Sequence, residues 1–159
     1  MATAMTSSPH LQREERGATL VEFVIVLPIL AALVLGIMSF GTAHAQRLAL
    51  TNAAREGARY GATLPVSAPN WAQTVSDVTT ASATGELDAG VPGRSVCVAL
   101  NSGSGWSGTS GAPCFNDGRP ANEPRVQVLV GRTTSIEAFF FSKSMNLSGR
   151  AVVRYEANP

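Results

Sequence analysis

The sequence has little of what catalysis and metal binding require. Its 159 residues include two histidines and two cysteines, and two cysteines cannot form a four-cysteine zinc site. The formal net charge is +1, so no strong field attracts a nucleic acid. No nucleophile and base stand together in a recognisable motif. We therefore expect no catalytic residue, no metal site, no cofactor and no nucleic-acid partner.

A long apolar run stands near the start of the chain instead. It extends from Ala18 to Phe40 and holds one carboxylate, Glu22. A bilayer-spanning helix needs about 20 residues, so residues 18–40 are predicted to cross a membrane. Pro28 lies inside this segment and predicts a kink or local melting, because proline removes a backbone donor and crowds the preceding turn. It is either a tolerated membrane proline or a point where the helix bends on packing with others.

Residues 41–64 are predicted to continue this helix in amphipathic form. One face repeats at alternating steps of three and four, the spacing of a helix. Small residues recur every fourth position from Ala49 to Gly61, so another backbone could approach closely. Pro65 ends the pattern, and a helix from Ala18 would be about 70 Å long. The predicted packing positions are Leu50, Ala53, Gly57, Tyr60, Gly61 and Leu64.

Glu22 is the most informative residue of the apolar run. A carboxylate at mid-membrane costs about 2.5–3.5 kcal/mol on insertion scales and is usually functional. If the chain were cut after Gly17, Ala18 would carry an α-amine that is mostly protonated at neutral pH. Glu22 of one subunit could then pair with the amine of its neighbour and compensate both charges. The alternative is an interfacial glutamate that reaches the headgroups of an ordinary signal anchor.

The rest of the chain, residues 65–159, is long enough for one small domain. A loop is predicted from Leu64 to Asn70, followed by a helix over Asn70–Ala83 that Asn70 or the preceding residues would cap. Trp71, Val75 and Val78 fall on one side of this helix.

Three segments alternate apolar and polar residues as half-buried strands do. They are residues 94–100, 125–132 and 150–156. One-sided strands need a cover, which the face around Leu50 to Leu64 provides. The prediction is an α+β fold, with a long N-terminal helix packed on a small antiparallel sheet. The polar faces, with Gln127, Arg150, Arg154 and Glu156, are expected to meet solvent.

A Gly/Ser-rich loop, residues 101–122, is predicted to be flexible. Cys97 and Cys114 bracket most of it. Outside the cytoplasm a disulfide between them is favoured, and closing this loop would contribute about 3 kcal/mol. The alternative is two unpaired thiols. Asp117 and Glu123 are interpreted as solvated acids in turns.

Two aromatic features could mark contact surfaces. Phe139, Phe140 and Phe141 are consecutive, so neither a helix nor a strand buries all three on one face. They are either core with one exposed ring or a membrane-proximal or partner-facing patch. Trp106 stands among glycine and serine and either folds back onto its own sheet or anchors a partner.

The start of the chain resembles a known family. Gly17, Ala18 and Glu22, followed by an apolar helix, resemble the class III leader of type IV pilins and pseudopilins. The longer pattern, RGATLVEFVIVLPILAALVLGIMSFG followed by LTNAAREGARYGA, resembles the TadE-like pseudopilins of tight-adherence (Flp-type) pilus systems. The ending AVVRYE is also similar to that family. The resemblance covers less than a third of the chain.

The resemblance implies that a prepilin peptidase removes residues 1–17 by cutting between Gly17 and Ala18. It implies a non-enzymatic minor component whose partners are sister pseudopilins, the major Flp pilin, the inner-membrane assembly platform and membrane lipid. It also implies a single pass through the bacterial inner membrane, with the C-terminal domain outside or in the pilus. Charge does not fix this orientation, because arginines flank the span on both sides.

Other functions remain open at this point. The chain could be a signal-anchored extracytoplasmic binding domain without a filament role, an anchored hydrolase, or a pseudopilin of a type II secretion system. Ala43-His44-Ala45 also matches a small-residue signal cleavage site. Whether the chain is cut after Gly17 tests the first of these alternatives, and an activity that depends on a named residue would support the second.

Overall fold

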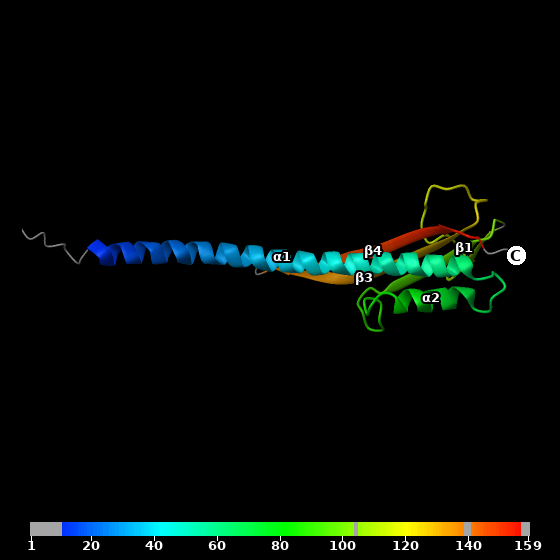
Figure 1. Ribbon diagram of the computed structural model, residues 1–159, viewed down its shortest axis with the longest axis horizontal. Helices are drawn as coiled ribbons and strands as arrows, with labels where there is room; N and C mark the ends of the chain where they lie inside the picture. Colours follow the sequence, from blue (N-terminus) through cyan, green and yellow to red (C-terminus); the bar gives the residue numbers. More distant parts are fainter. Residues whose placement is uncertain (1–10, 104, 139–140, 157–159) are drawn as a thin grey trace, which may run out of the picture.

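One helix runs through the molecule, and the other elements pack along its C-terminal half (Figure 1). The computed structural model describes residues 11–103, 105–138 and 141–156, with side chains from Thr19 onward except those of Ala138 and Phe141. The chain forms an α+β fold, as the sequence predicts. Its elements are α1 (Leu11–Thr63), α2 (Trp71–Ala81), β1 (Ser95–Asn101), β2 (Trp106–Gly108), β3 (Arg125–Ala138) and β4 (Phe141–Arg154).

Helix α1 is 53 residues long and continues through Pro28 without interruption. The predicted kink or local melting is therefore wrong for the isolated chain. A proline in a helix removes one donor, and the regular turns on both sides preserve the helix axis (Figure 1). The helix also begins at Leu11, so its first turns precede Ala18, where the sequence pattern placed its start.

The sheet is antiparallel, with strand order β2-β1-β3-β4. Strands β3 and β4 form a long hairpin whose pairing runs from Arg125–Arg154 to Ala138–Phe141. Strand β3 continues six residues past the predicted range 125–132, and β4 begins nine residues before the predicted range 150–156 and ends at Arg154. The added residues 133–138 of β3 are mostly polar and do not alternate, so the hydrophobic pattern misses them. On β4, Met145 and Leu147 do alternate with Ser144, Asn146 and Ser148, a signal that the prediction did not use. Strand β2 lies in the loop that was expected to be irregular.

The core lies between α1, α2 and one face of the sheet. Alanines line much of the helix face that packs on β-branched residues of the strands, so helix and sheet come close together. Burying a Val or Leu side chain contributes about 1.5–3 kcal/mol. The fully buried core residues include Leu50, Ala53, Ala54, Ala58, Val75, Val98, Val126, Val128 and Val130.

Glycines set the closest approaches in this core. A Cβ added to Gly149 of β4 would lie 2.5 Å from the backbone carbonyl of Leu50, and one added to Gly61 would lie 3.0 Å from Trp71. Gly57 faces Thr79 of α2 in the same way. At Gly57 and Gly61 the small-residue stripe of α1 is therefore occupied by the chain's own α2.

Helix α2 matches its predicted range but starts differently from expectation. Asn70 has a left-handed backbone (φ 58°) and its side chain makes no capping hydrogen bond. Its carbonyl instead accepts hydrogen bonds from the backbone and hydroxyl of Thr74. The buried side consists of Trp71, Val75 and Thr79, with Val78 only half-buried.

Candidate functional site

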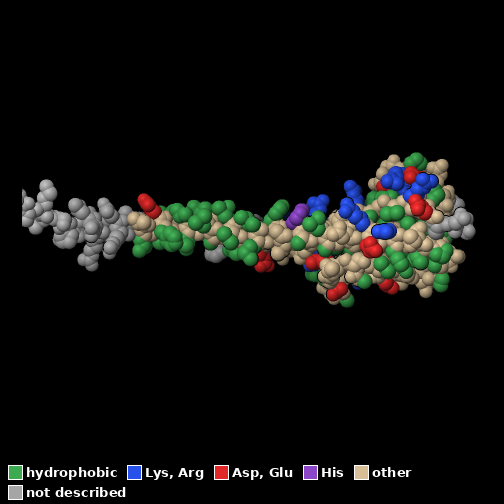
Figure 2. All heavy atoms as spheres, in the orientation of Figure 1, with side chains coloured by type: hydrophobic (Ala, Val, Ile, Leu, Met, Phe, Trp, Pro, Cys, Tyr) green, Lys and Arg blue, Asp and Glu red, His purple; other side chains and the backbone are tan. Residues whose placement is uncertain are grey.

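The part of α1 from Leu20 to Phe40 is almost entirely apolar, and the described residues leave its large apolar side chains exposed. Every large apolar side chain from Leu20 to Phe40 is exposed, the least exposed being Leu35 at 41%. Figure 2 shows this stretch as a rod of hydrophobic side chains projecting from the rest of the molecule. A helix that is apolar all round belongs in a membrane or among other helices. By length and composition it can cross a membrane.

Glu22 lies close to one end of this rod. The rod is about 30 Å long from Leu20 to Phe40 at 1.5 Å per residue, which matches the hydrocarbon core of a bilayer. The Glu22 side chain is exposed and has no hydrogen bond or ion pair with any residue that the structure describes. Its proposed partner, the Ala18 amine of a neighbour, requires a second subunit. The pairing therefore stays a prediction.

The predicted cut between Gly17 and Ala18 falls within the backbone of α1. The side-chain surroundings of these two residues lie outside the described part of the chain. The predicted cleavage is therefore neither supported nor opposed by local geometry, and it stays a prediction.

The C-terminal half of α1 has two different sides. The predicted packing positions Leu50, Ala53, Gly57 and Gly61 are buried, and Tyr60 and Leu64 are partly buried against the core. The opposite side carries exposed arginines. They are Arg47, Arg55 and Arg59.

The Gly/Ser-rich loop is held against the outer face of the sheet, the face opposite α1. Cys97 of β1 and Cys114 of the loop form a disulfide with an S–S distance of 2.08 Å and a Cα–Cα distance of 5.8 Å. Strand β2 pairs with the end of β1. The Arg125 guanidinium lies 5.0 Å from the centre of the Trp106 ring. Trp106 thus folds back onto its own sheet.

A buried ion pair fixes the loop to β3. The Asp117 carboxylate lies 2.8 Å from the Arg125 Nε, and their side chains are 8% and 4% exposed. The Gln127 amide donates to Asp117 at 2.9 Å, and its oxygen accepts the backbone N–H of Cys114 at 3.0 Å. The predictions of a solvated Asp117 and a solvent-facing Gln127 are therefore wrong. Alternation along β3 indicates the face of each side chain but not that a distant loop covers that face.

These contacts also decide the protonation of Asp117. Burial raises the pKa of the carboxyl, but four effects together outweigh it. They are the hydrogen bond from Gln127, the backbone hydrogen bond from Arg119, the positive charge of Arg125 and the hydrogen bond from the Arg125 side chain. The pKa of Asp117 is consequently held below its ordinary value of 3.8, and the ion pair persists at neutral pH.

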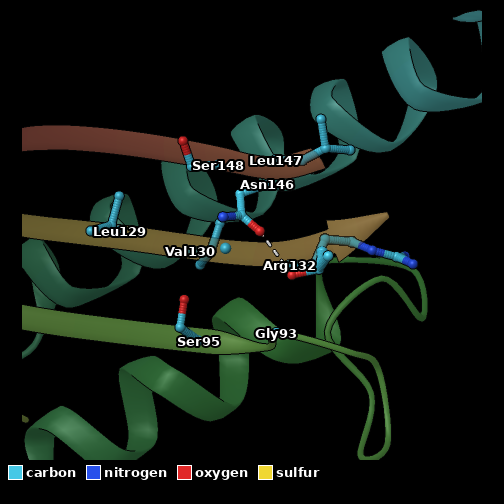
Figure 3. A pocket seen from close by; sticks show the side chains of 10 residues that line it. Gly93, Ser95, Leu129, Val130, Arg132, Asn146, Leu147 and Ser148 are labelled. Atoms are coloured by element: carbon cyan, nitrogen blue, oxygen red, sulfur yellow. Dashed lines mark hydrogen bonds between the residues drawn. The ribbon is translucent and has the colours of Figure 1, made fainter. Parts of the chain in front are cut away.

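A shallow cavity of about 440 Å³ lies on the outer face, around Gly131 where three strands meet (Figure 3). Ser95, Asn146 and Ser148 line it, and Asn146 accepts a hydrogen bond from the Thr133 hydroxyl at 2.8 Å. These hydroxyl and amide groups offer no base to activate a nucleophile. Across the described residues, no group of three His, Cys, Asp or Glu side chains could hold a metal.

The predicted phenylalanine patch cannot be placed. Phe139 and Phe140 lie outside the described residues, and for Phe141 only the backbone, at the start of β4, is described. Both interpretations of this patch stay open.

The chain was compared with known proteins. Residues 17–59 match the TadE-like protein family. This segment is TadE-like. The match runs from the predicted cut to the exposed Arg59, so it contains the whole apolar rod and most of the helix face beneath the sheet. No curated protein and no solved structure matches the chain. The TadE-like match thus concerns α1 and not α2 or the sheet.

Proposed function

We propose that this chain is a membrane-anchored, pseudopilin-like minor component of a tight-adherence (Flp-type) pilus assembly system. The observation that carries the proposal is the division of α1 into an exposed apolar rod and a half buried in the head, the part of the fold that comprises residues 43–156. The TadE-like match falls on the same helix. A pilin-like subunit needs this combination of a helix for the membrane and an attached domain for display.

The proposed mechanism is assembly of helix on helix. The apolar rods of neighbouring subunits pack together, and Glu22 pairs with the Ala18 amine that cleavage by a prepilin peptidase creates. This pairing would set the axial register, since each charge finds its partner only at one offset. The head, with its internal disulfide, would lie outside the inner membrane. The protein has no enzymatic role in this scheme.

The proposed partners follow from the TadE-like resemblance. They are the peptidase, sister pseudopilins, the major Flp pilin and the inner-membrane assembly platform. Major pilins of these systems are much shorter, so the large head favours a minor subunit.

The decisive experiment is to locate the mature N-terminus. Intact-mass analysis and N-terminal sequencing of protein from bacterial membranes should find Ala18 first. Gly17→Leu should keep the leader, because the peptidase accepts little but a small residue there. Gly36→Leu is the matched control, because a Cβ at Gly36 meets nothing within 4 Å, and it should be processed normally. A mature chain that keeps Met1 or begins after Ala45 would refute the proposal.

A signal-anchored binding domain is the second candidate. In this candidate the chain stays uncut and keeps α1 from Leu11 onward. The same N-terminal analysis separates it from the first candidate. A type II secretion pseudopilin would be cut like the first candidate, and only its assembly partners would differ.

A further inference from the structure

The far end of the β3–β4 hairpin reaches back to the apolar rod of α1. The hydroxyl of Ser39 donates to the backbone carbonyl of Glu137 at 2.8 Å, although the two residues are 98 positions apart. Glu137 pairs with Ser142, one pair before the described end of the hairpin. Figure 1 shows β3 and β4 extending along α1 toward its N-terminal half.

Two contacts give the course of the hairpin along the helix. Gly149 packs against the backbone of Leu50, and Glu137 meets Ser39. These helix positions are about 16 Å apart at 1.5 Å per residue. The hairpin therefore follows α1 for about three turns and does not project sideways into solvent.

Ser39 lies at the boundary of the rod. Phe40 is the last residue of the rod and is 69% exposed. Ala43, three positions further along the helix, is buried. The length of the rod from Leu20 to Phe40, about 30 Å, equals the thickness of the hydrocarbon core of a bilayer. If the rod spans a bilayer, the Glu137 carbonyl is then at the level of the outer headgroups.

We propose that the far end of the β3–β4 hairpin is a lipid-contact surface that lies in the headgroup layer beside α1. The inference rests on the membrane anchoring in the proposed function. It commits to one occupant, the phospholipid surface, because the hairpin end is continuous with the membrane-spanning rod. Phe139 and Phe140 are outside the described residues, so the surface is defined by Ile136, Glu137, Ser142 and Lys143 alone.

The chemistry of these residues fits a headgroup layer. Ile136 is half-buried, whereas Glu137, Ser142 and Lys143 are exposed. One carboxylate and one ammonium group match the paired charges of zwitterionic headgroups. A lysine can also keep its ammonium among phosphates while its methylene groups lie along apolar surface. The hairpin would act as a second support that fixes the tilt of the head relative to the membrane.

The test measures depth along one strand in proteoliposomes of phosphatidylcholine and phosphatidylglycerol. Ser142→Cys, Ser144→Cys and Ser148→Cys each carry an environment-sensitive fluorophore in the full-length chain. All three serines are exposed, and their even spacing places them on one face of β4. The native cysteines are joined in the disulfide, so each introduced thiol is the only free one.

The label at residue 142 should be quenched by headgroup nitroxide lipids and should be several-fold less accessible to iodide than the label at 148. The position at 144 should fall between them. The label at 148 is the matched control, since it is about 20 Å farther along the same strand. Equal iodide quenching at 142 and 148 would overturn the proposal.

A label at Leu30→Cys distinguishes a failure of the lipid contact from a failure of the membrane anchoring. If it is shielded from iodide while 142 and 148 are equally accessible, the anchor stands and the lipid contact is wrong. If the label at 30 is itself accessible to iodide, the membrane anchoring fails and the lipid contact fails with it.

Lysine reactivity gives an independent measurement without a fluorophore. Lys143 is the single lysine in the sequence, so mass spectrometry can follow its acylation by a membrane-impermeant reagent. A Ser148→Lys variant supplies an internal reference lysine on the same strand. In proteoliposomes Lys143 should react several-fold more slowly than the lysine introduced at 148, and equal rates would refute the contact.

Discussion

The two halves of α1 share one backbone conformation but differ in the size and exposure of their apolar side chains. Between Leu20 and Phe40 large apolar side chains point in all directions and remain exposed, whereas between Ala43 and Ala62 the buried positions are mostly alanine and glycine. Large side chains suit a fluid or interchangeable environment such as lipid. Small ones suit a fixed neighbour at short range, because they let the backbone of β4 reach Leu50. Apolar character alone therefore does not tell which part of a helix its own fold buries.

The largest effect should come from the charge in the exposed half. Glu22→Ala should leave insertion and cleavage intact, since removal of a charge eases insertion. It should weaken association by about 3–5 kcal/mol, because the partner's Ala18 amine loses its counter-charge. Glu22→Gln should weaken the association of subunits nearly as much. Crosslinking between engineered cysteines on neighbouring helices, with a count of surface pili, measures the effect.

The comparison breaks down if Glu22→Ala protein is processed, crosslinks normally and supports piliation. Glu22 would then be an interfacial residue, and the proposed register mechanism would have to be abandoned. The TadE-like assignment of α1 would survive that result.

The second prediction compares a leucine-to-alanine substitution in each half of α1. Leu50→Ala should lower the free energy of unfolding of the head by about 2–5 kcal/mol, because Leu50 is fully buried in the core. Leu30→Ala should leave it unchanged, because Leu30 is 53% exposed and is not among the described residues that form the core or pack against it. Urea unfolding in detergent, followed by tryptophan fluorescence, gives both values. Similar losses for the two variants would show that the rod also stabilises the head.

The smallest effect concerns pH and should be confined to the head. The folded-state pKa of Asp117 is lowered, so its contribution to stability is present above its unfolded pKa of about 3.9 and is lost as pH falls through the lowered folded value. Wild-type unfolding should therefore become easier in acid, and Asp117→Asn should flatten that part of the pH profile.

Denaturation between pH 2.5 and 7, with helix crosslinking measured in parallel, checks the third prediction. Asp88→Asn is the control, because Asp88 is exposed and lies outside the ion pair with Arg125. If the stability of Asp117→Asn falls with pH as steeply as that of the wild type, Asp117 does not cause the loss of stability in acid.

The sequence was sufficient for features that depend on local pattern. Helical spacing gave α1 and the face around Leu50, and alternation gave the inner face of β1 and β3. The pairing of residues 133–138 with 141–146 was missed, because residues 133–138 are mostly polar and pair through their backbones. On β4 the alternation of Met145 and Leu147 with serine and asparagine was available and was not used. Gly149 did carry a usable signal, since glycine within a strand often marks a close backbone approach.

The candidate site was less accessible to sequence reasoning. The burial of Asp117 and Gln127 depends on a loop that folds across a sheet, which no spacing rule along the chain encodes. The partner of Glu22 requires a second subunit, and the hydrogen bond from Ser39 to Glu137 joins residues 98 positions apart. Each of these contacts depends on the tertiary arrangement and not on local propensity.

The unbroken course of α1 has a mechanical consequence. No flexible linker separates the rod from the head, and β3 and β4 lie alongside the helix (Figure 1). A pull along the helix axis must therefore slide α1 against the whole sheet at once and cannot peel one contact at a time. Two contacts resist that sliding. Gly149 packs closely against the backbone of Leu50, and the Tyr155 hydroxyl donates to the Leu64 carbonyl at 2.9 Å. A pull on the rod would therefore be transmitted directly to the sheet of the head.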